Sequence, residues 1–403
     1  MIDLIAEIRR NPIEKELAFE RAEYAARVEK VQRRMAEAGL DVLLISNTGN
    51  LGYLTGYDTS MPPGYTVGIL PAQGEVVLHC SELEATCALL FSTIEDFAVF
   101  HWYDAQDTGT HLGGILRERG YDGKRIGVEM GYAETFASGA FDTKSYLSLV
   151  ELMPGATFED ATNLVLDVRI IKSPAEIAYM RKAGAITALG LDAAIGAAKE
   201  GGMDNDCIAA AHAAMIGAGS ELMSIDPMIM SGRRAGYMPH IPYKRVRLAK
   251  GDPIYLEFTG TYERYNAPSM RSAVIGPPSD GIRRLADASL ATVELLLANI
   301  RPGRTGHDIA QDAKRALEGV PEAFFHGGFG YSIGMGFQPT WTEAPMYIAD
   351  GIERELEAGM TFHLPICAWV PAQYGIGFSE SIVVTEAGCE LLTPERGREL
   401  AVR

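Results

Sequence analysis

The segment Tyr237–Arg271 reads YMPHIPYKRVRLAKGDPIYLEFTGTYERYNAPSMR, and it sets the pattern for the second half of the chain. His240 lies in a proline-flanked turn, and a Lys-Gly-Asp turn signal precedes an apolar, β-prone run over 253–259. A second strand follows over 272–275, after a polar turn. The segment therefore predicts a hairpin of two strands, with one carboxylate, Glu257, in the middle of an otherwise apolar strand.

Glu257 is the residue of this hairpin that needs an explanation. An ionised carboxylate in a buried strand is costly unless the charge is paired or used. One interpretation places Glu257 on the solvent-exposed side of an edge strand, and His240 is then a turn histidine without a catalytic role. The other makes Glu257 and His240 an acid/base or nucleophilic pair that the fold brings together.

The rest of the second half combines long helices with further hairpins. One helix is expected to begin at Pro174, with Ser173 as its N-cap, and to continue through Ala197. Further helices are expected over 204–218, 282–300 and 306–319, and further strands over 227–231, 360–364 and 378–385. This mixture is typical of an α+β domain.

The first half has a different pattern. An amphipathic helix is expected over 17–38, ending at Gly39, and the apolar run 41–46 predicts a buried strand. Strands and helices then alternate up to residue 160, which is typical of an α/β domain with a largely parallel or mixed sheet. The segment 163–173 is the expected passage between the halves. We therefore predict one domain over 1–165 and a second over 166–403.

Composition limits the classes of partner and compartment. The chain has 403 residues and a formal net charge of −17, which argues against nucleic acid or an anionic membrane as a partner. The five cysteines are scattered without a CxxC motif, as expected in a reducing cytoplasm. The first residues lack the apolar core of a signal peptide, and no apolar run is long enough to span a membrane. These features predict a soluble, cytoplasmic protein.

Four motifs in the second half occur in a characteristic order: LVLDVRIIKSPAEIAYMRKAGAIT, GYSIGMGFQPTWTEAP, LEAGMTFHLPI and IGFSESIVVTEAG. Together they resemble the creatinase and aminopeptidase P family, and RVEKVQRRMAEAGLDVLLISNTGNLGYLTGY extends the resemblance to the first half. The resemblance implies a creatinase-type N-terminal α/β domain followed by an α+β catalytic domain with the "pita-bread" fold.

The resemblance also implies where a metal site would lie. Metallopeptidases of this family hold two metal ions with two Asp, one His and two Glu. The matching positions here are Glu257, Pro268, Tyr331, Pro365 and Ser379. Proline offers no side-chain donor, and Ser or Tyr hydroxyls are poor ligands for a hard divalent ion. We therefore expect no metal and no other cofactor, which argues against metallopeptidase activity.

Two other features of the family pattern survive. Pro239 and His240 are kept, and a histidine in this region resembles the general base of metal-free creatinase. The segments SGRRAGYMPHIPYKR and YLEFTGTYERYNAPSMRS are similar to metal-free relatives that hydrolyse a cyclic amidine. On this hypothesis Glu257 faces the planar cation and attacks it or activates water, and His240 transfers a proton.

The substrate-binding candidates follow from the chemistry of a flat cation that carries a carboxylate. Aromatic walls suit such a cation, and its carboxylate needs a donor. Arg271 is the first choice of donor and Arg233 the second, although Arg271 could instead pair with Glu263 at the surface. The other candidates are Tyr331, Trp369, Trp341, Tyr255, Glu380 and, from the first domain, Tyr65. His326 and His363 flank would-be ligand positions, and either could simply be a packed histidine.

Several functions remain open at this level. The same fold hosts creatinase-like amidinohydrolases, metal-dependent X-Pro peptidases and dimethylsulfoniopropionate lyases, and a non-catalytic binding protein is an alternative of another class. The resemblance further implies a homodimer whose active site is covered by the neighbour's N-terminal domain, with 57–65 as a lid. A deacetylase that processes the product is the other expected partner.

Overall fold

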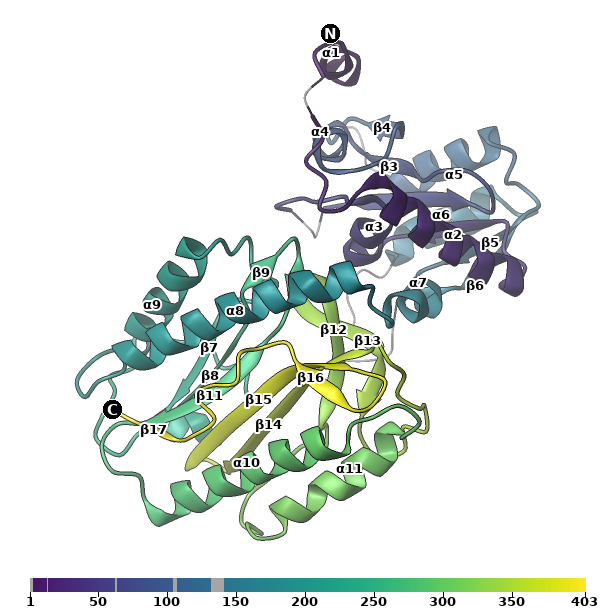
Figure 1. The fold of residues 1–403 in the computed structure, drawn as a ribbon. Coiled ribbons are helices and arrows are strands. Elements are labelled where there is room, and N and C mark those ends of the chain that lie inside the picture. Colours follow the sequence, from purple (N-terminus) through teal and green to yellow (C-terminus); the bar gives the residue numbers. More distant parts are fainter. Residues whose placement is uncertain (1–2, 13, 62–63, 104–106, 132–140) are drawn as a thin grey trace. The chain divides into compact units, whose positions relative to one another are not determined.

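The computed structural model describes residues 3–12, 14–61, 64–103, 107–131 and 141–403, apart from the side chains of 344 and 345. The chain divides into two compact units, 1–169 and 170–403 (Figure 1). The predicted boundary between 165 and 166 lies inside the last helix of the first unit. Part of the predicted lid over 57–65, namely 62–63, lies outside the described residues.

Unit 1 contains a six-stranded mixed sheet in the order β4-β3-β2-β1-β5-β6. The pairs β1–β2 and β2–β3 are antiparallel, and the other three pairs are parallel. The strands are β1 Val42–Ile45, β2 Thr66–Pro71, β3 Val77–Ser81, β4 Asp96–Phe100, β5 Arg125–Val128 and β6 Thr157–Asp160. This is the mixed α/β arrangement that the alternating pattern predicted.

The described helices of unit 1 include three that the sequence pattern did not predict, α1, α3 and α7. The helices are α1 Leu4–Arg10, α2 Arg21–Ala38, α3 Thr48–Thr55, α4 Glu82–Phe91, α5 Thr108–Glu118, α6 Thr143–Leu152 and α7 Thr162–Arg169. Helix α2 ends at Gly39, which is left-handed (φ 70°), as expected. Helix α3 forms in a glycine-rich segment because the Asn47 side chain caps it by accepting from the Asn50 N–H.

Unit 2 contains two sheets. A four-stranded sheet has the order β17-β11-β8-β7, and a second sheet has the order β16-β15-β14-β12-β10-β9, with β13 paired to β12. The strands are β7 Met228–Ser231, β8 Pro253–Phe258, β9 Thr261–Tyr262, β10 Tyr265–Asn266, β11 Ser269–Val274, β12 Gly330–Phe337, β13 Thr340–Ile348, β14 Thr361–Val370, β15 Tyr374–Val384, β16 Cys389–Leu391 and β17 Ala401–Val402. The predicted hairpin exists: β8 and β11 pair antiparallel, with Glu257 opposite Met270.

Each sheet of unit 2 is covered by its own helices. Apolar residues of α8 (Pro174–Ala197) and α9 (Asp204–Gly217) pack on the four-stranded sheet, and those of α10 (Asp280–Asn299) and α11 (Gly306–Lys314) pack on β14 and β15 (Figure 1). Two short 3₁₀ turns, η1 Gly232–Gly236 and η2 Arg315–Leu317, complete the unit. Ser173 caps α8 in a full capping box with Glu176, and Pro174 takes the first position, as predicted.

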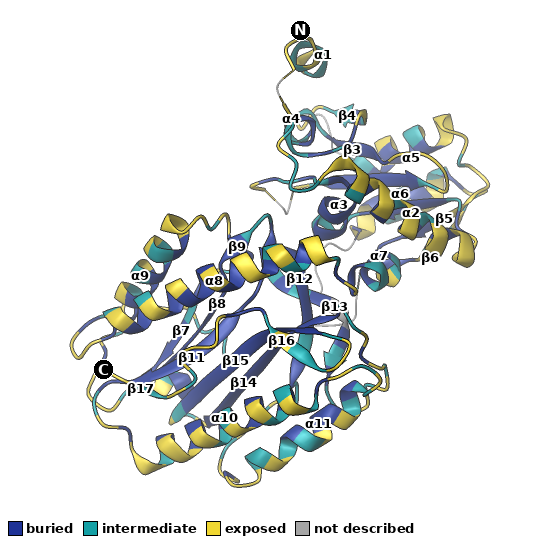
Figure 2. Ribbon diagram, in the orientation of Figure 1, coloured by how far each residue is buried: buried dark blue, intermediate teal, exposed yellow. Residues whose placement is uncertain are grey.

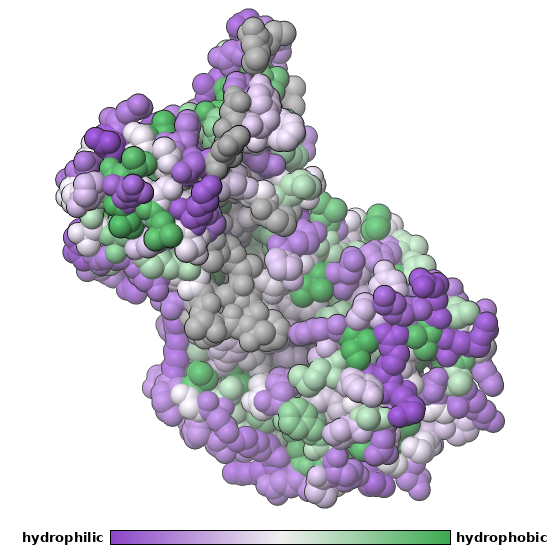
Figure 3. All heavy atoms as spheres, turned by 180° about the vertical axis from the view of Figure 1, so that it is seen from behind, coloured by the Kyte–Doolittle hydropathy of each residue, from purple (hydrophilic) through white to green (hydrophobic). Residues whose placement is uncertain are grey.

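The strands that carry the candidate residues are the most buried elements of unit 2. Strands β8, β11 and β14 are buried along their whole length, whereas α8 and α10 alternate between buried and exposed positions (Figure 2). Figure 3 shows polar residues over much of the visible surface, with apolar residues scattered among them. Among the described helices, none is long and apolar enough to cross a membrane.

Candidate active site

Side-chain alternation along β8 places Glu257 between the two sheets of unit 2. Ile254, Leu256 and Phe258 belong to the core beneath α8 and α9. Tyr255 points the other way, into a cluster that includes Cys367 and Trp369 of β14. Because successive strand residues point to opposite faces, Glu257 shares the face of Tyr255 and is directed toward the second sheet. The interpretation of Glu257 as a solvent-exposed edge residue is therefore wrong.

The carboxyl of Glu257 is buried without a hydrogen-bond partner among the described residues. Its exposed fraction is 4%, and burial raises its pKa to about 8. In turn, Glu257 contributes to the raised pKa values of Tyr255, Tyr331 and Cys367, which places these side chains near it. A buried acid that lacks a compensating donor is a candidate functional group.

A row of hydrogen bonds lies beside Glu257. His363 Nδ1 is 2.8 Å from the Tyr331 hydroxyl, and His363 Nε2 is 2.6 Å from Ser379 Oγ. Trp341 donates its indole N–H to the Tyr331 hydroxyl at 2.8 Å. His363 Nδ1 also lies 3.9 Å from Glu257 Oε1. His363 is completely buried, and burial, followed by the charge of Arg271, lowers its pKa to about 3.

His240 lies at the exposed end of a second row of aromatic and imidazole rings. Partial desolvation lowers its pKa, and the charge of His240 contributes to the lowered pKa of His326, so the two rings are neighbours. The His326 ring lies 6.0 Å from that of Trp369, whose indole N–H donates to the Tyr255 hydroxyl at 3.0 Å. The row thus runs from His240 to Tyr255, on the face of β8 that carries Glu257.

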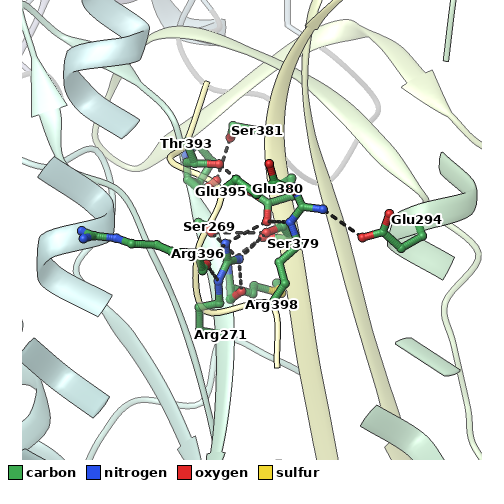
Figure 4. Close-up of polar contacts among 12 residues, drawn as sticks. Ser269, Arg271, Glu294, Ser379, Glu380, Ser381, Thr393, Glu395, Arg396 and Arg398 are labelled. Carbon is green, nitrogen blue, oxygen red and sulfur yellow. Dashed lines mark hydrogen bonds and ion pairs between the residues drawn. The ribbon is translucent and has the colours of Figure 1, made fainter. Parts of the chain in front are cut away.

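Arg271 and Glu380 occupy a different place from the one expected of substrate-binding residues. The Arg271 guanidinium donates to Glu380 Oε1 at 2.8 Å and to the carbonyls of Met270, Ser379 and Arg396 (Figure 4). A cavity of about 20 Å³ beside Arg271 is lined by α8 and by 393–397, so this side chain lies on the α8 side of β11. Arg271 therefore supports the packing of β11 against β15, and its donors are already engaged.

The two remaining candidates, Arg233 and Tyr65, make other contacts. Arg233 is exposed, in η1, and its Nε atom is 3.5 Å from the Ala372 carbonyl. Tyr65 belongs to unit 1, where its hydroxyl is 3.1 Å from His79 Nδ1. Ten site residues were predicted. The contacts above link five of them to one another, namely Glu257, Tyr255, Tyr331, Trp341 and Trp369, and they link His240 to this group through His326.

Comparison with known proteins agrees with the fold. The model of metallopeptidase family M24 matches residues 178–386, and that of the creatinase/prolidase N-terminal domain matches 27–171. The chain belongs to family M24. Its catalytic domain therefore has the pita-bread fold, behind a creatinase-type N-terminal domain.

Three M24 relatives indicate the range of the family. Ectoine hydrolase from Halomonas elongata is 33% identical over 94% of this chain and 97% of its own length. The Xaa-Pro dipeptidase from Pyrococcus horikoshii is 26% identical over 91% of this chain and 96% of its own. The crystal structure of dipeptidase PepE from Mycobacterium ulcerans superposes with a TM-score of 0.77 at 26% identity, covering 95% of this chain and 99% of that one.

The residues present do not fit the two-metal centre of M24 metallopeptidases. The residues matched above, by sequence motif, to the family's metal ligands are Glu257, Pro268, Tyr331, Pro365 and Ser379. Within the described part of the chain, no group of three or more His, Cys, Asp or Glu side chains could hold a metal ion. Tyr331 and Ser379 instead bind His363, which occupies space near Glu257. From the sequence, His363 could be a packed histidine, although its position, two residues before Pro365, puts it on the inward face of β14.

Proposed function

We propose that this M24 hydrolase opens the ring of ectoine, a cyclic amidine, by hydrolysis without a metal ion and releases N-acetyl-2,4-diaminobutyrate. The observation that carries the proposal is the buried Glu257 carboxyl, which has no hydrogen-bond donor among the described residues. The similarity to ectoine hydrolase over nearly the full length of both chains supports the same substrate. 5-Hydroxyectoine, which differs by one hydroxyl, is a second candidate substrate.

A planar amidinium offers what the Glu257 carboxyl lacks. The cation provides N–H donors and a positive charge, which favour the ionised carboxylate over the neutral acid. Tyr255, Tyr331 and Trp369 add aromatic surface near Glu257, and a cation is attracted to aromatic faces. Substrate binding would thus convert a neutral acid into a carboxylate positioned beside the amidine carbon.

The reaction adds one water to the amidine carbon and breaks one ring C–N bond. Glu257 acts either as the nucleophile that adds to this carbon or as the base that takes a proton from the attacking water. His240 accepts a proton and returns it to the departing ring nitrogen. The single product carries an acetamide and a free amine, and it contains all the atoms of ectoine and water.

Incubation of chelator-treated protein with ectoine, followed by proton NMR, tests the proposal. We expect conversion to N-acetyl-2,4-diaminobutyrate without added metal and no conversion by the Glu257→Gln variant. The matched control is Glu129→Gln, which changes a buried carboxyl in unit 1. Turnover only after addition of a divalent ion would contradict the metal-free part, and turnover of creatine instead of ectoine would contradict the substrate. Saturable binding without turnover would favour a binding protein.

Two partners belong to the same proposal. We propose a homodimer in which the neighbour's N-terminal domain covers the active site, and light scattering of the purified protein tests it, because a monomer would have a mass near 43.6 kDa. The acetamide product also requires a deacetylase if its amino groups are to be recovered. Co-incubation with such an enzyme should release acetate only after ectoine has been hydrolysed.

A further inference from the structure

Methionine side chains flank Glu257 on both sides within the four-stranded sheet. In the register of this sheet, Glu257 of β8 lies opposite Met270 of β11 and opposite Met228 of β7. Directly opposite residues of antiparallel strands project from the same face, with Cβ atoms about 4.5–5.5 Å apart. Both methionines also pack in the cluster of Tyr255 and Trp369, which lies on the Glu257 face. The neighbours of Glu257 on the two adjacent strands are therefore thioethers.

The two methionines differ in how tightly they are held. Met270 is 1% exposed, and a Cβ atom at Gly377 of β15 would lie only 3.2 Å from its sulfur, so the glycine leaves the space that this side chain fills. Met228 lies on β7, an edge strand of the sheet, and is only partly buried against the same cluster. Met270 is therefore a fixed wall of the site, whereas Met228 is an adjustable one, because a methionine side chain has three rotatable bonds.

The proposed reaction brings a methyl group next to Glu257. Hydrolysis of an amidine gives an acetamide only when the amidine carbon carries a methyl group, and in a six-membered cyclic amidine this methyl lies between the two ring N–H groups. A carboxylate that accepts from either N–H, or that attacks the amidine carbon, therefore has the methyl beside it. A cyclic guanidine carries an amino group at this place, and its N–H donors need acceptors. A thioether packs well against a methyl group but is a weak acceptor for an N–H donor.

From the register of the sheet we infer that Met228 and Met270 are specificity-determining residues that contact the methyl group on the amidine carbon, so that the site prefers a C-methyl cyclic amidine to a cyclic guanidine. This preference deepens the proposed function and rests on its assignment of Glu257 to the amidine. It also separates ectoine from creatine, because the reacting carbon of creatine belongs to a guanidine and carries nitrogen in place of the methyl group.

Three cations that share one ring measure the preference directly: tetrahydropyrimidinium with a methyl group, a hydrogen or an amino group on the amidine carbon. Calorimetric titration of the full-length protein at pH 8, where about half of Glu257 is ionised, gives the three dissociation constants. We expect the methyl compound to bind about 5- to 20-fold tighter than the hydrogen compound, as for one methyl group in an apolar pocket. It should bind at least about 10-fold tighter than the amino compound, whose donors would stay unpaired. Equal affinities, a preference for the amino compound or no binding of any of the three would overturn the inference.

Substitution of Met228 tests whether the methionines set this preference, and its partial exposure makes the change compatible with folding. Met228→Gln replaces the thioether with an amide of similar length, whose oxygen accepts from an amino group, so the methyl and amino compounds should then bind within about threefold of each other. Met228→Leu should keep the wild-type preference. Met203→Gln is the matched control, because Met203 is also partly exposed but precedes α9, which packs on the opposite face of the sheet. An unchanged preference in Met228→Gln would overturn the inference.

Hydrolysis assays with the same proteins separate this inference from the proposed function. If the wild type does not hydrolyse ectoine, but prefers the methyl compound and loses that preference in Met228→Gln, the proposed reaction fails and the specificity stands. If ectoine is hydrolysed and Met228→Gln keeps the preference, the reaction stands and the specificity fails. Where both hold, Met228→Gln should lower kcat/KM for ectoine about tenfold, and Met228→Leu should stay close to the wild type.

Discussion

His363 Nδ1 lies 3.9 Å from Glu257 Oε1, and yet the two side chains do not form an ion pair. Burial lowers the pKa of His363 to about 3 and raises that of Glu257 to about 8. Between these values both groups are predominantly neutral, so a buried pair that could carry opposite charges carries none. At neutral pH this pair therefore contributes no charge to the free site.

The pH dependence of the reaction follows from this relationship. In the free protein Glu257 is mostly protonated below pH 8, and only the carboxylate can attack the amidine or activate water. We expect kcat/KM for ectoine to rise about tenfold per pH unit between pH 6 and 7 and to level off above pH 8. Steady-state rates across this range, in buffers of constant ionic strength, provide the measurement. A flat profile would mean that Glu257 is already ionised.

Binding of a cation should release a proton. Acetamidinium presents the amidinium group alone, and its binding should shift Glu257 from the acid to the carboxylate. At pH 7 we expect close to one proton to be released per site in the wild type and none in Glu257→Gln. Calorimetric titration in buffers of different ionisation enthalpy measures this number. Equal proton release by both proteins would show that another group titrates.

The same pKa predicts how Glu257 affects stability. Its pKa is about 8 when folded and near 4.5 when unfolded, so the folded state retains the proton longer and loses stability as pH rises from 4.5 to 8. Each pKa unit corresponds to about 1.4 kcal/mol. Glu257→Gln should therefore match the wild type near pH 4.5 and be more stable at pH 8, by about 4 kcal/mol, in urea denaturation.

Glu129 gives the contrasting case in unit 1. It is equally buried, and its pKa is raised to about 7, but it accepts hydrogen bonds from Ser46 N–H, Asn47 N–H and the Asn50 amide. The N–H₂ group of a glutamine at this position would face one of these N–H donors and could not accept its hydrogen bond. We expect Glu129→Gln to lose about 1–3 kcal/mol at pH 8. If both glutamine variants changed stability in the same direction, hydrogen bonding would not be what separates the two sites.

Sequence patterns predicted the elements that have local signals. The capped start of α8, the end of α2 at Gly39 and the β8–β11 hairpin depend on residues close together in the chain, and all three are present. The strand β14 was expected over 360–364, but it continues to Val370. The hairpin of β12 and β13 was not predicted, because β12 is glycine-rich with one β-branched residue, Ile333, and its pairing depends on β14.

The site, too, was predicted only where the signal lies in residues close together in the chain. The cost of burying Glu257 follows from its place in an apolar strand, and its inward direction is confirmed by the packing of its neighbours. The network of Tyr331, His363 and Ser379 could not be predicted, because it joins three strands whose register only the folded sheet defines. Arg271 was expected to bind the substrate. It lies instead on the α8 side of β11, where it pairs with Glu380.

Glu380 neutralises one buried and one partly exposed arginine of unit 2. Arg271 Nη2 and Arg398 Nε lie 2.8 and 3.0 Å from Glu380 Oε1, and Thr393 donates to Oε2 at 2.6 Å. Only 1% of the Glu380 side chain is exposed, so water could not solvate the arginines if the carboxylate were removed. Because removing one member of a buried ion network leaves the others unpaired, Glu380→Gln should destabilise the protein by about 3–5 kcal/mol in urea denaturation.

Glu395 supplies the control for this network. It lies 3.3 Å from Arg398, but 76% of its side chain is exposed (Figure 4). Solvent screens such a pair, and Glu395→Gln should change stability by less than about 0.5 kcal/mol. Similar losses for both variants would mean that the C-terminal segment is held mainly by its surface charges. If Glu380 instead bound substrate, Glu380→Gln would raise KM for ectoine while leaving stability unchanged, which is the opposite of what the buried ion network requires.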